Sequence, residues 1–256
     1  DEEDRTLDLT DANRTLSQVV RKAGLFLNLK ISRYITRMRT TQWKNAARCQ
    51  IMCSHQPLRP LQLSDYKGKW VVLFSHPGDF TPVCTTEFIA FAQAQPQFAA
   101  QNAQLLGLSI DSNPSHLAWI YAIYLTTGVE IPFPVIADRT GEIARLYGII
   151  APDASKQETG RNVFIIDPQQ KIRAILIYPL TNGRNIPEIL RLLTALQTTD
   201  KYRVVTPANW QPGQPVLVPP PQTYDALLNR QNDPKAQGLT CKDWFLCGKE
   251  LPGGEE

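Results

Sequence analysis

The sequence contains little that would place it in a membrane or on nucleic acid. None of its hydrophobic runs approaches the roughly 18 apolar residues that a transmembrane helix needs. The formal charge at pH 7 is only +3, which is too small to argue for a nucleic-acid partner. Five cysteines are an odd number, which fits a closed disulfide framework poorly. It fits a reducing compartment, and we expect the cytoplasm, where thiols serve chemistry.

Acidic side chains are missing from a long N-terminal stretch. No Asp or Glu occurs between Ala12 and Ser64, whereas residues 1–11 are acidic. The Lys and Arg residues of this stretch are interleaved with apolar ones such as Val19 and Leu27. Arg-rich, acid-poor segments can be organelle transit peptides, but the acidic start and the length favour an N-terminal extension of unclear role. A basic amphipathic helix that touches a membrane or a partner is a further alternative.

Composition divides the chain into three regions. Residues 1–60 are the N-terminal extension, residues 61–199 form the main domain, and residues 200–256 form an arm. The arm is crowded with proline, at Pro207, Pro212, Pro215, Pro219, Pro220 and Pro221. Such a stretch is expected to be extended and to reach over a surface instead of building its own core.

Alternating strands and helices are predicted for residues 61–199. After a short helix or turn at 63–69, strands are predicted at 70–75, 105–110, 134–137, 162–166 and 172–178. Helices are predicted at 85–101, at a segment that carries His116, Trp119 and Tyr121, and at 140–146 and 187–197. Ser112 or Asn113 caps the second of these helices, with Pro114 in its first turn. This order predicts an α/β fold with a mixed central sheet flanked by helices.

One cysteine stands where a strand gives way to a helix. An apolar run at 71–74 is followed by a loop with two prolines and a glycine, and Cys84 comes directly before Thr85 and Thr86, which are plausible helix caps. Backbone N–H groups and the helix dipole at such a point favour a thiolate over a thiol. An isolated cysteine is otherwise often a small buried hydrophobic residue. The loop around Cys84 favours a reactive one.

The loop has the pattern P-x-x-x-T-x-x-C, formed by Pro77, Thr81 and Cys84. It resembles the peroxidatic loop of the peroxiredoxins. The resemblance implies a thioredoxin-like fold and a thiol-dependent peroxidase in which Cys84 attacks the peroxide. The Thr81 hydroxyl would then accept a hydrogen bond from the thiol or bond a peroxide oxygen, and Pro77 would shield the site from water.

Two arginines and a glutamate are implied by the same resemblance. Peroxide cleavage needs a permanent positive charge that presents several donors. Arg161, at the start of the strand 162–166, matches the family's arginine. Arg184 resembles a second family arginine, near the site or a subunit interface, and Glu87 is expected to support both.

Further residues resemble the long one-cysteine branch, also called the peroxiredoxin-six type. His76, directly before Pro77, stands where that branch has a histidine, which could polarise the site or fill space in the core. The paired cysteines of the tail, Cys241 and Cys247, resemble those of archaeal-type members, in which a tail cysteine resolves the oxidised nucleophile. The sequence does not say which one acts.

This resemblance covers residues 61–256. Members open with a hairpin upstream of position 61, and the residues at 49–60 do not match it. The resemblance implies no haem, flavin or metal. It implies hydrogen peroxide and alkyl hydroperoxides as substrates, a thioredoxin-like reductant, and a homodimer that could assemble into a ring of dimers.

Two other classes of function compete with this one. The fold could serve as a redox-dependent chaperone or scaffold with little turnover. Alternatively, Cys49, Cys53 and His55 could form a zinc-binding module together with Cys241 and Cys247. The spacing is not the paired C-x2-C type, which argues against the zinc module.

Overall fold

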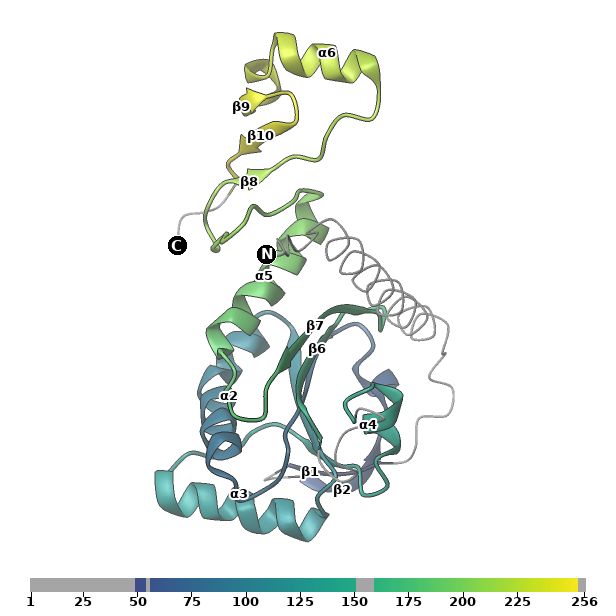
Figure 1. The fold of residues 1–256 in the computed structure, drawn as a ribbon, viewed down its shortest axis with the longest axis vertical. Coiled ribbons are helices and arrows are strands. Elements are labelled where there is room, and N and C mark those ends of the chain that lie inside the picture. The colour runs from purple at the N-terminus through teal and green to yellow at the C-terminus, as the bar shows by residue number, and fades with distance from the viewer. Residues whose placement is uncertain (1–48, 54–55, 151–158, 253–256) are drawn as a thin grey trace, which may run out of the picture. The chain divides into compact units, whose positions relative to one another are not determined.

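The computed structural model describes residues 49–53, 56–150 and 159–252 of the 256-residue chain (Figure 1). The basic segment before residue 49 and His55 therefore lie outside the described residues. The amphipathic helix considered for that segment falls outside the described residues as well. In the described part of the chain, no helix is both long and apolar enough to cross a membrane.

A seven-stranded sheet forms the centre of the main domain, in the order β2-β1-β5-β4-β3-β6-β7. Its strands are β1 Cys49–Cys53, β2 Gln56–Leu61, β3 Trp70–Ser75, β4 Ala103–Ser109, β5 Val135–Ala137, β6 Arg161–Ile166 and β7 Ile172–Tyr178. The pairs β3–β4 and β4–β5 are parallel, while the remaining pairs are antiparallel. The sheet is mixed, which confirms the predicted α/β, thioredoxin-like class.

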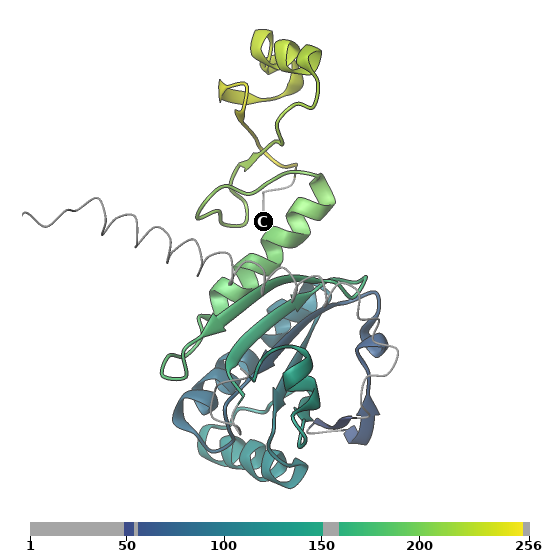
Figure 2. The same cartoon turned by 45° about the vertical axis from the view of Figure 1, so that its right-hand side comes forward.

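Three helices share one apolar core with one face of this sheet. They are α2 Pro82–Ala100, α3 Asn113–Thr127 and α5 Ile186–Tyr202. The short helix α4 Glu142–Leu146 lies on the other side of the sheet (Figures 1 and 2). There Tyr147 packs edge-on against Phe164, with ring centroids 5.0 Å apart.

Aromatic side chains fill the core between β3, α2 and α3. Phe74 of β3 stacks on Phe91 of α2 with ring centroids 4.0 Å apart, and it meets Phe88 edge-on at 5.5 Å. Phe88 also packs against Trp119 of α3 at 4.5 Å. Because such rings are large and bury much apolar area, they hold β3, α2 and α3 in a fixed relation.

Two of the differences from the sequence-based expectation affect the catalytic helix and the central sheet. Helix α2 begins at Pro82 with Thr81 as its N-cap, so Thr85 and Thr86 do not cap it. The expectation missed that Pro82 can occupy the first helical turn, where its absent N–H costs nothing. The second difference lies upstream, where β1 and β2 pair as an antiparallel hairpin. Residues 49–61 therefore contribute two strands to the main sheet.

The C-terminal region contains more regular structure than its prolines predict. Strands β8 Val216–Leu217, β10 Leu246–Lys249 and β9 Thr240–Asp243 form a separate three-stranded sheet, joined by helix α6 Tyr224–Asn232 and by the 3-10 turn η2 Lys235–Gln237. Trp210 and Val216 are buried with Ala195 and Val204 in a small cluster. This cluster includes Ala195 of α5, so the apolar residues of the arm pack on that helix.

Candidate active site

Cys84 lies in the first turn of α2 and is fully buried. The chain arrives there from β3 through the loop at 76–81, whose last residue caps the helix. The Thr85 amide donates to the Thr81 carbonyl at 3.0 Å, which closes the first helical turn. The sulfur therefore lies at the positive end of the helix dipole, where negative charge is favoured.

A guanidinium touches the sulfur. Arg161 Nη1 lies 3.3 Å from Cys84 Sγ, and Arg161 Nε donates to the Leu180 carbonyl at 2.9 Å. Arg161 begins β6, which pairs antiparallel with β3. This pairing brings the start of β6 next to the carboxyl end of β3, so residues 77 positions apart in sequence meet at one point.

Glu87 joins Arg161 to a second arginine. Its Oε2 accepts from Arg161 Nη1 at 2.9 Å and from Arg184 Nη2 at 2.6 Å, while its Oε1 accepts from Arg184 Nε and the Arg184 amide, each at 2.9 Å. Arg184 Nη1 donates in addition to the Ser75 carbonyl at 2.8 Å. Burial lowers the pKa of Arg184, and its bonds to Glu87 oppose that shift.

The charges of this cluster do not cancel while Cys84 is a thiol. Glu87, Arg161 and Arg184 are all buried, and together they carry one surplus positive charge. A thiolate at Cys84 would bring the sum to zero. Because an uncompensated buried charge is costly, the cluster is suited to receive one negative charge.

Local hydrogen bonds from side chains to backbone carbonyls stabilise the loop before Cys84. Thr81 Oγ1 donates to the Gly78 carbonyl at 2.9 Å, and Thr85 Oγ1 donates to the Thr81 carbonyl at 2.8 Å. Phe80 adopts a φ of 57° and is 59% exposed. In this left-handed conformation the Phe80 side chain is turned to the surface.

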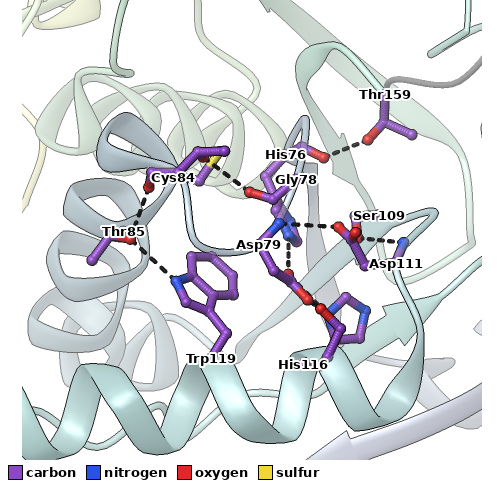
Figure 3. Close-up of polar contacts among 12 residues, drawn as sticks. His76, Gly78, Asp79, Cys84, Thr85, Ser109, Asp111, His116, Trp119 and Thr159 are labelled. Carbon is purple, nitrogen blue, oxygen red and sulfur yellow. Dashed lines mark hydrogen bonds and ion pairs between the residues drawn. The ribbon is translucent and has the colours of Figure 1, made fainter.

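A second buried cluster lies on the α3 side of the loop (Figure 3). The Asp79 carboxylate is 3.0 Å from His76 Nε2 and 2.8 Å from His116 Nδ1. Both imidazoles are fully buried. Hydrogen bonds from the two rings hold the pKa of Asp79 well below its usual range, despite its burial. Burial lowers the pKa of His76, so this ring is neutral near pH 7.

The structure brings together most of the residues singled out from the sequence. Cys84, Glu87, Arg161 and Arg184 form one contact network, with Thr81 at the helix cap. Residues 241 and 247 lie elsewhere, as partners in register on β9 and β10, and their sulfurs are bonded to each other.

Asp79 and His116 were missed as functional candidates. The motif has no fixed residue at position 79, and His116 was noted only as part of a helix. One signal was available: α3 contains no Asp, Glu, Lys or Arg, so His116 is its single ionisable side chain apart from tyrosines. A lone polar ring on such a helix needs a buried partner.

A metal ion has one possible ligand group among the described residues. Single donor atoms of His76, Asp79 and His116 lie within 4.8 Å of one another. The facing atoms of these residues already form the hydrogen bonds given above, so they need no metal ion as a partner. The zinc module considered from the sequence would also lose two thiolates, because Cys241 and Cys247 share a disulfide.

Comparison with known proteins places this geometry in a family. A model of the AhpC/TSA family matches residues 47–175, and a model of the C-terminal domain of 1-Cys peroxiredoxin matches residues 195–233. The chain belongs to the AhpC/TSA family of peroxiredoxins. It is accordingly a thiol peroxidase, an oxidoreductase. The match begins at residue 47, so the expectation that the resemblance fails before position 61 was wrong; the family's opening hairpin is β1–β2.

Individual relatives agree with this assignment. The chain is 62% identical over 192 residues to peroxiredoxin 2 of Caldanaerobacter subterraneus subsp. tengcongensis, covering 75% of this chain and 86% of the relative. A peroxiredoxin of Methanosarcina mazei is 50% identical, with 73% and 87% covered. Among solved structures, peroxiredoxin 6 of Arenicola marina is 36% identical with a TM-score of 0.67, and the alignment covers 76% of this peroxiredoxin and 92% of that chain.

Proposed function

We propose that Cys84 is the peroxidatic nucleophile of this peroxiredoxin. The observation that carries the proposal is the 3.3 Å contact between Arg161 Nη1 and the buried Cys84 sulfur. The thiolate attacks one peroxide oxygen, the O–O bond breaks, and the second oxygen leaves as an alcohol or water after taking up a proton. Cys84 is thereby oxidised to a sulfenic acid.

Arg161 supports this step through its charge and its position. Its remaining N–H groups can stabilise the negative charge that develops on the leaving oxygen. Glu87 and Arg184 keep this guanidinium in place, and Thr81 and Pro77 shape the loop in front of the sulfur. Because Cys84 is fully buried, we expect compact substrates, namely hydrogen peroxide and small alkyl hydroperoxides.

The tail cysteines would restore Cys84 in two exchanges. One tail thiol condenses with the sulfenic acid, which releases water and forms a mixed disulfide with Cys84. The other tail thiolate then attacks the tail sulfur of that bond and frees Cys84. The bond between Cys241 and Cys247 supports this order, because it is the product of the second exchange. A thioredoxin-like dithiol would reduce it.

Two subunits would pair to bring a tail to a neighbouring site. β7 is an edge strand of the main sheet, and Ile177 on it is 73% exposed. An exposed apolar edge strand is a template for pairing with another chain. We therefore expect a homodimer, which could assemble further into a ring.

The test is the mass of the intact protein after one equivalent of hydrogen peroxide, followed by peptide mapping without reduction. We expect oxidation at Cys84 first and a Cys241–Cys247 disulfide as the later product. Cys84→Ser should abolish peroxide consumption; activity near the wild-type level would remove Cys84 from its role. Cys241→Ser should halt the cycle at a disulfide between Cys84 and Cys247. A Cys84 sulfinic acid with both tail thiols free would show a one-cysteine enzyme.

A further inference from the structure

The buried Asp79 carboxylate lies between two imidazoles that come from different elements. His76 follows β3, Asp79 belongs to the loop, and His116 lies in the first turns of α3. Asp79 Oδ1 is 3.0 Å from both His76 Nε2 and His116 Nδ1, and Asp79 Oδ2 is 2.8 Å from His116 Nδ1 (Figure 3). Three side chains that span 40 positions of the sequence therefore share one carboxylate.

The chemistry of the carboxylate fixes where the protons lie. An ionised Asp79 can only accept hydrogen bonds, so both facing ring nitrogens must carry a hydrogen. His76 is thus the Nε2–H tautomer, and because burial keeps this ring neutral, its Nδ1 carries a lone pair and no proton. That Nδ1 is buried and has no hydrogen-bond partner among the described residues.

Asp79 is itself held by groups on the β4–α3 side. Its backbone amide donates to Asp111 Oδ2 at 3.1 Å, and the same oxygen accepts from Ser109 Oγ at 2.8 Å. The bond to Asp111 holds the backbone of residue 79, from which the carboxylate reaches the two rings. The loop conformation and the tautomer of His76 are determined by one set of bonds.

Helix α3 makes a second contact close to Cys84. Three residues after His116, Trp119 Nε1 donates to Thr85 Oγ1 at 3.1 Å, directly after Cys84. One face of α3 therefore contacts the loop before Cys84 through Asp79 and the helix after it through Thr85. Displacement of α3 would change the approach to the sulfur from both sides.

We propose that Asp79 and His116 are positioning residues for the peroxidase reaction, which lock the loop before Cys84 and hold His76 as the Nε2–H tautomer with an unprotonated Nδ1. The proposal rests on the proposed role of Cys84. Neither residue is part of the loop motif, and neither touches the sulfur in the contacts described. Their effect passes through His76 and the loop backbone.

The first experiment measures the tautomer and the rate in the same variants. The chain has only three histidines, so nitrogen-15 shifts of the imidazoles can be assigned with His76→Gln and His116→Asn. We expect the wild-type His76 as the Nε2–H form. In Asp79→Asn the amide can donate to Nε2 and so favour the Nδ1–H form, and Cys84 oxidation should slow about tenfold or more.

The second experiment separates the hydrogen bond from the shape of the side chain. Asn at position 116 places an amide N–H where His116 has its Nδ1, whereas Leu places no donor there. His116→Leu should slow Cys84 oxidation about tenfold, and His116→Asn should stay within about threefold of the wild type. Thermal unfolding of each variant shows whether it folds; if His116→Leu does not, Asp79→Asn decides.

Several outcomes would overturn the proposal. One is a wild-type His76 in the Nδ1–H form. Others are an Asp79→Asn variant whose His76 tautomer changes while Cys84 oxidation keeps its rate, or one in which oxidation slows while the tautomer is unchanged. The last is a His116→Asn variant that oxidises Cys84 as slowly as His116→Leu. A wild-type protein whose Cys84 is not oxidised at all would instead refute the proposed function. The tautomer measurement does not depend on activity, so the two failures remain distinguishable.

Discussion

Two buried ionic clusters flank the same loop, and they are built from different kinds of groups. On one side, Glu87 binds Arg161 and Arg184, whose guanidinium groups stay charged at any ordinary pH. On the other side, Asp79 binds His76 and His116, whose rings can gain or lose a proton. The fixed charges contact the sulfur, whereas the titratable rings contact the loop that leads to it.

The two clusters make different contributions to the site. The arginine cluster provides a constant electrostatic environment for Cys84, with one surplus positive charge that a thiolate neutralises. The histidine cluster provides directional hydrogen bonds that fix the loop and are sensitive to pH. The four predictions below separate these contributions.

The largest effect on stability should come from Glu87→Gln. The change leaves two buried guanidinium groups without their carboxylate, and removing one partner of a buried ion pair costs about 3–5 kcal/mol. Chemical denaturation should show this loss of unfolding free energy. Glu188→Gln is the matched control, since Glu188 pairs with Arg191 at the surface and should cost less than about 1 kcal/mol. Equal losses in the two variants would contradict a special role for burial.

Among changes to the two clusters, Arg161→Ala should have the largest effect on the rate of Cys84 oxidation. It removes the charged donor beside Cys84 Sγ, and loss of one such donor typically lowers a rate by about 100-fold. Stopped-flow measurement of the second-order oxidation by hydrogen peroxide tests this. Arg173→Ala provides the control, because Arg173 binds Asp200 at the surface and should leave the rate unchanged. An Arg161→Ala rate within twofold of the wild type would refute the assignment.

Lowering the pH should destabilise the folded protein through His76, by less than the substitutions above. Unfolded His76 has a pKa near 6.5, and burial lowers the pKa in the folded protein. Below pH 6.5 the unfolded chain therefore binds a proton that the folded one does not, and stability falls with decreasing pH. The pKa of Asp79 lies far below this window. The melting temperature should drop between about pH 7.5 and pH 5.5, and by less in His76→Gln, which cannot titrate. An equal drop in both proteins would show that His76 does not contribute.

The smallest effect is expected at the start of α3. Ser112 Oγ accepts from the Ser115 amide at 3.3 Å and so caps the helix that carries His116. Ser112→Ala should cost about 1 kcal/mol of stability without slowing Cys84 oxidation, because the Asp79 contacts remain. The exposed Ser64→Ala should change stability by less than about 0.5 kcal/mol. A large rate loss in Ser112→Ala would mean that the cap, and not only His116, positions the loop.

Local sequence patterns predicted much of the main domain. β3 occupies the expected 70–75, and β7 the expected 172–178. Ser112 caps α3 as its sequence indicated. These features depend on neighbouring residues: an apolar run indicates the buried strand β3, and a hydroxyl before a helix indicates its cap.

Predictions were poorer where contacts between distant segments decide the outcome. The hairpin β1–β2 was not recognised, because strand pairing stabilises residues whose own pattern is weak. The three-stranded sheet of the tail was missed for the same reason. Cross-strand pairing instead places Cys241 opposite Cys247.

The motif, the class of chemistry and the residues that carry charge can all be read from the sequence. Cys84, Thr81 and Pro77 lie within one short loop, so their grouping needs no fold. Only the tertiary structure decided which charges meet. The antiparallel pairing of β6 with β3 brings Arg161 to the sulfur, and the parallel pairing of β4 with β3 brings α3 and His116 to Asp79. Strand register sets such distances, and it results from packing of the whole sheet, which no local pattern encodes.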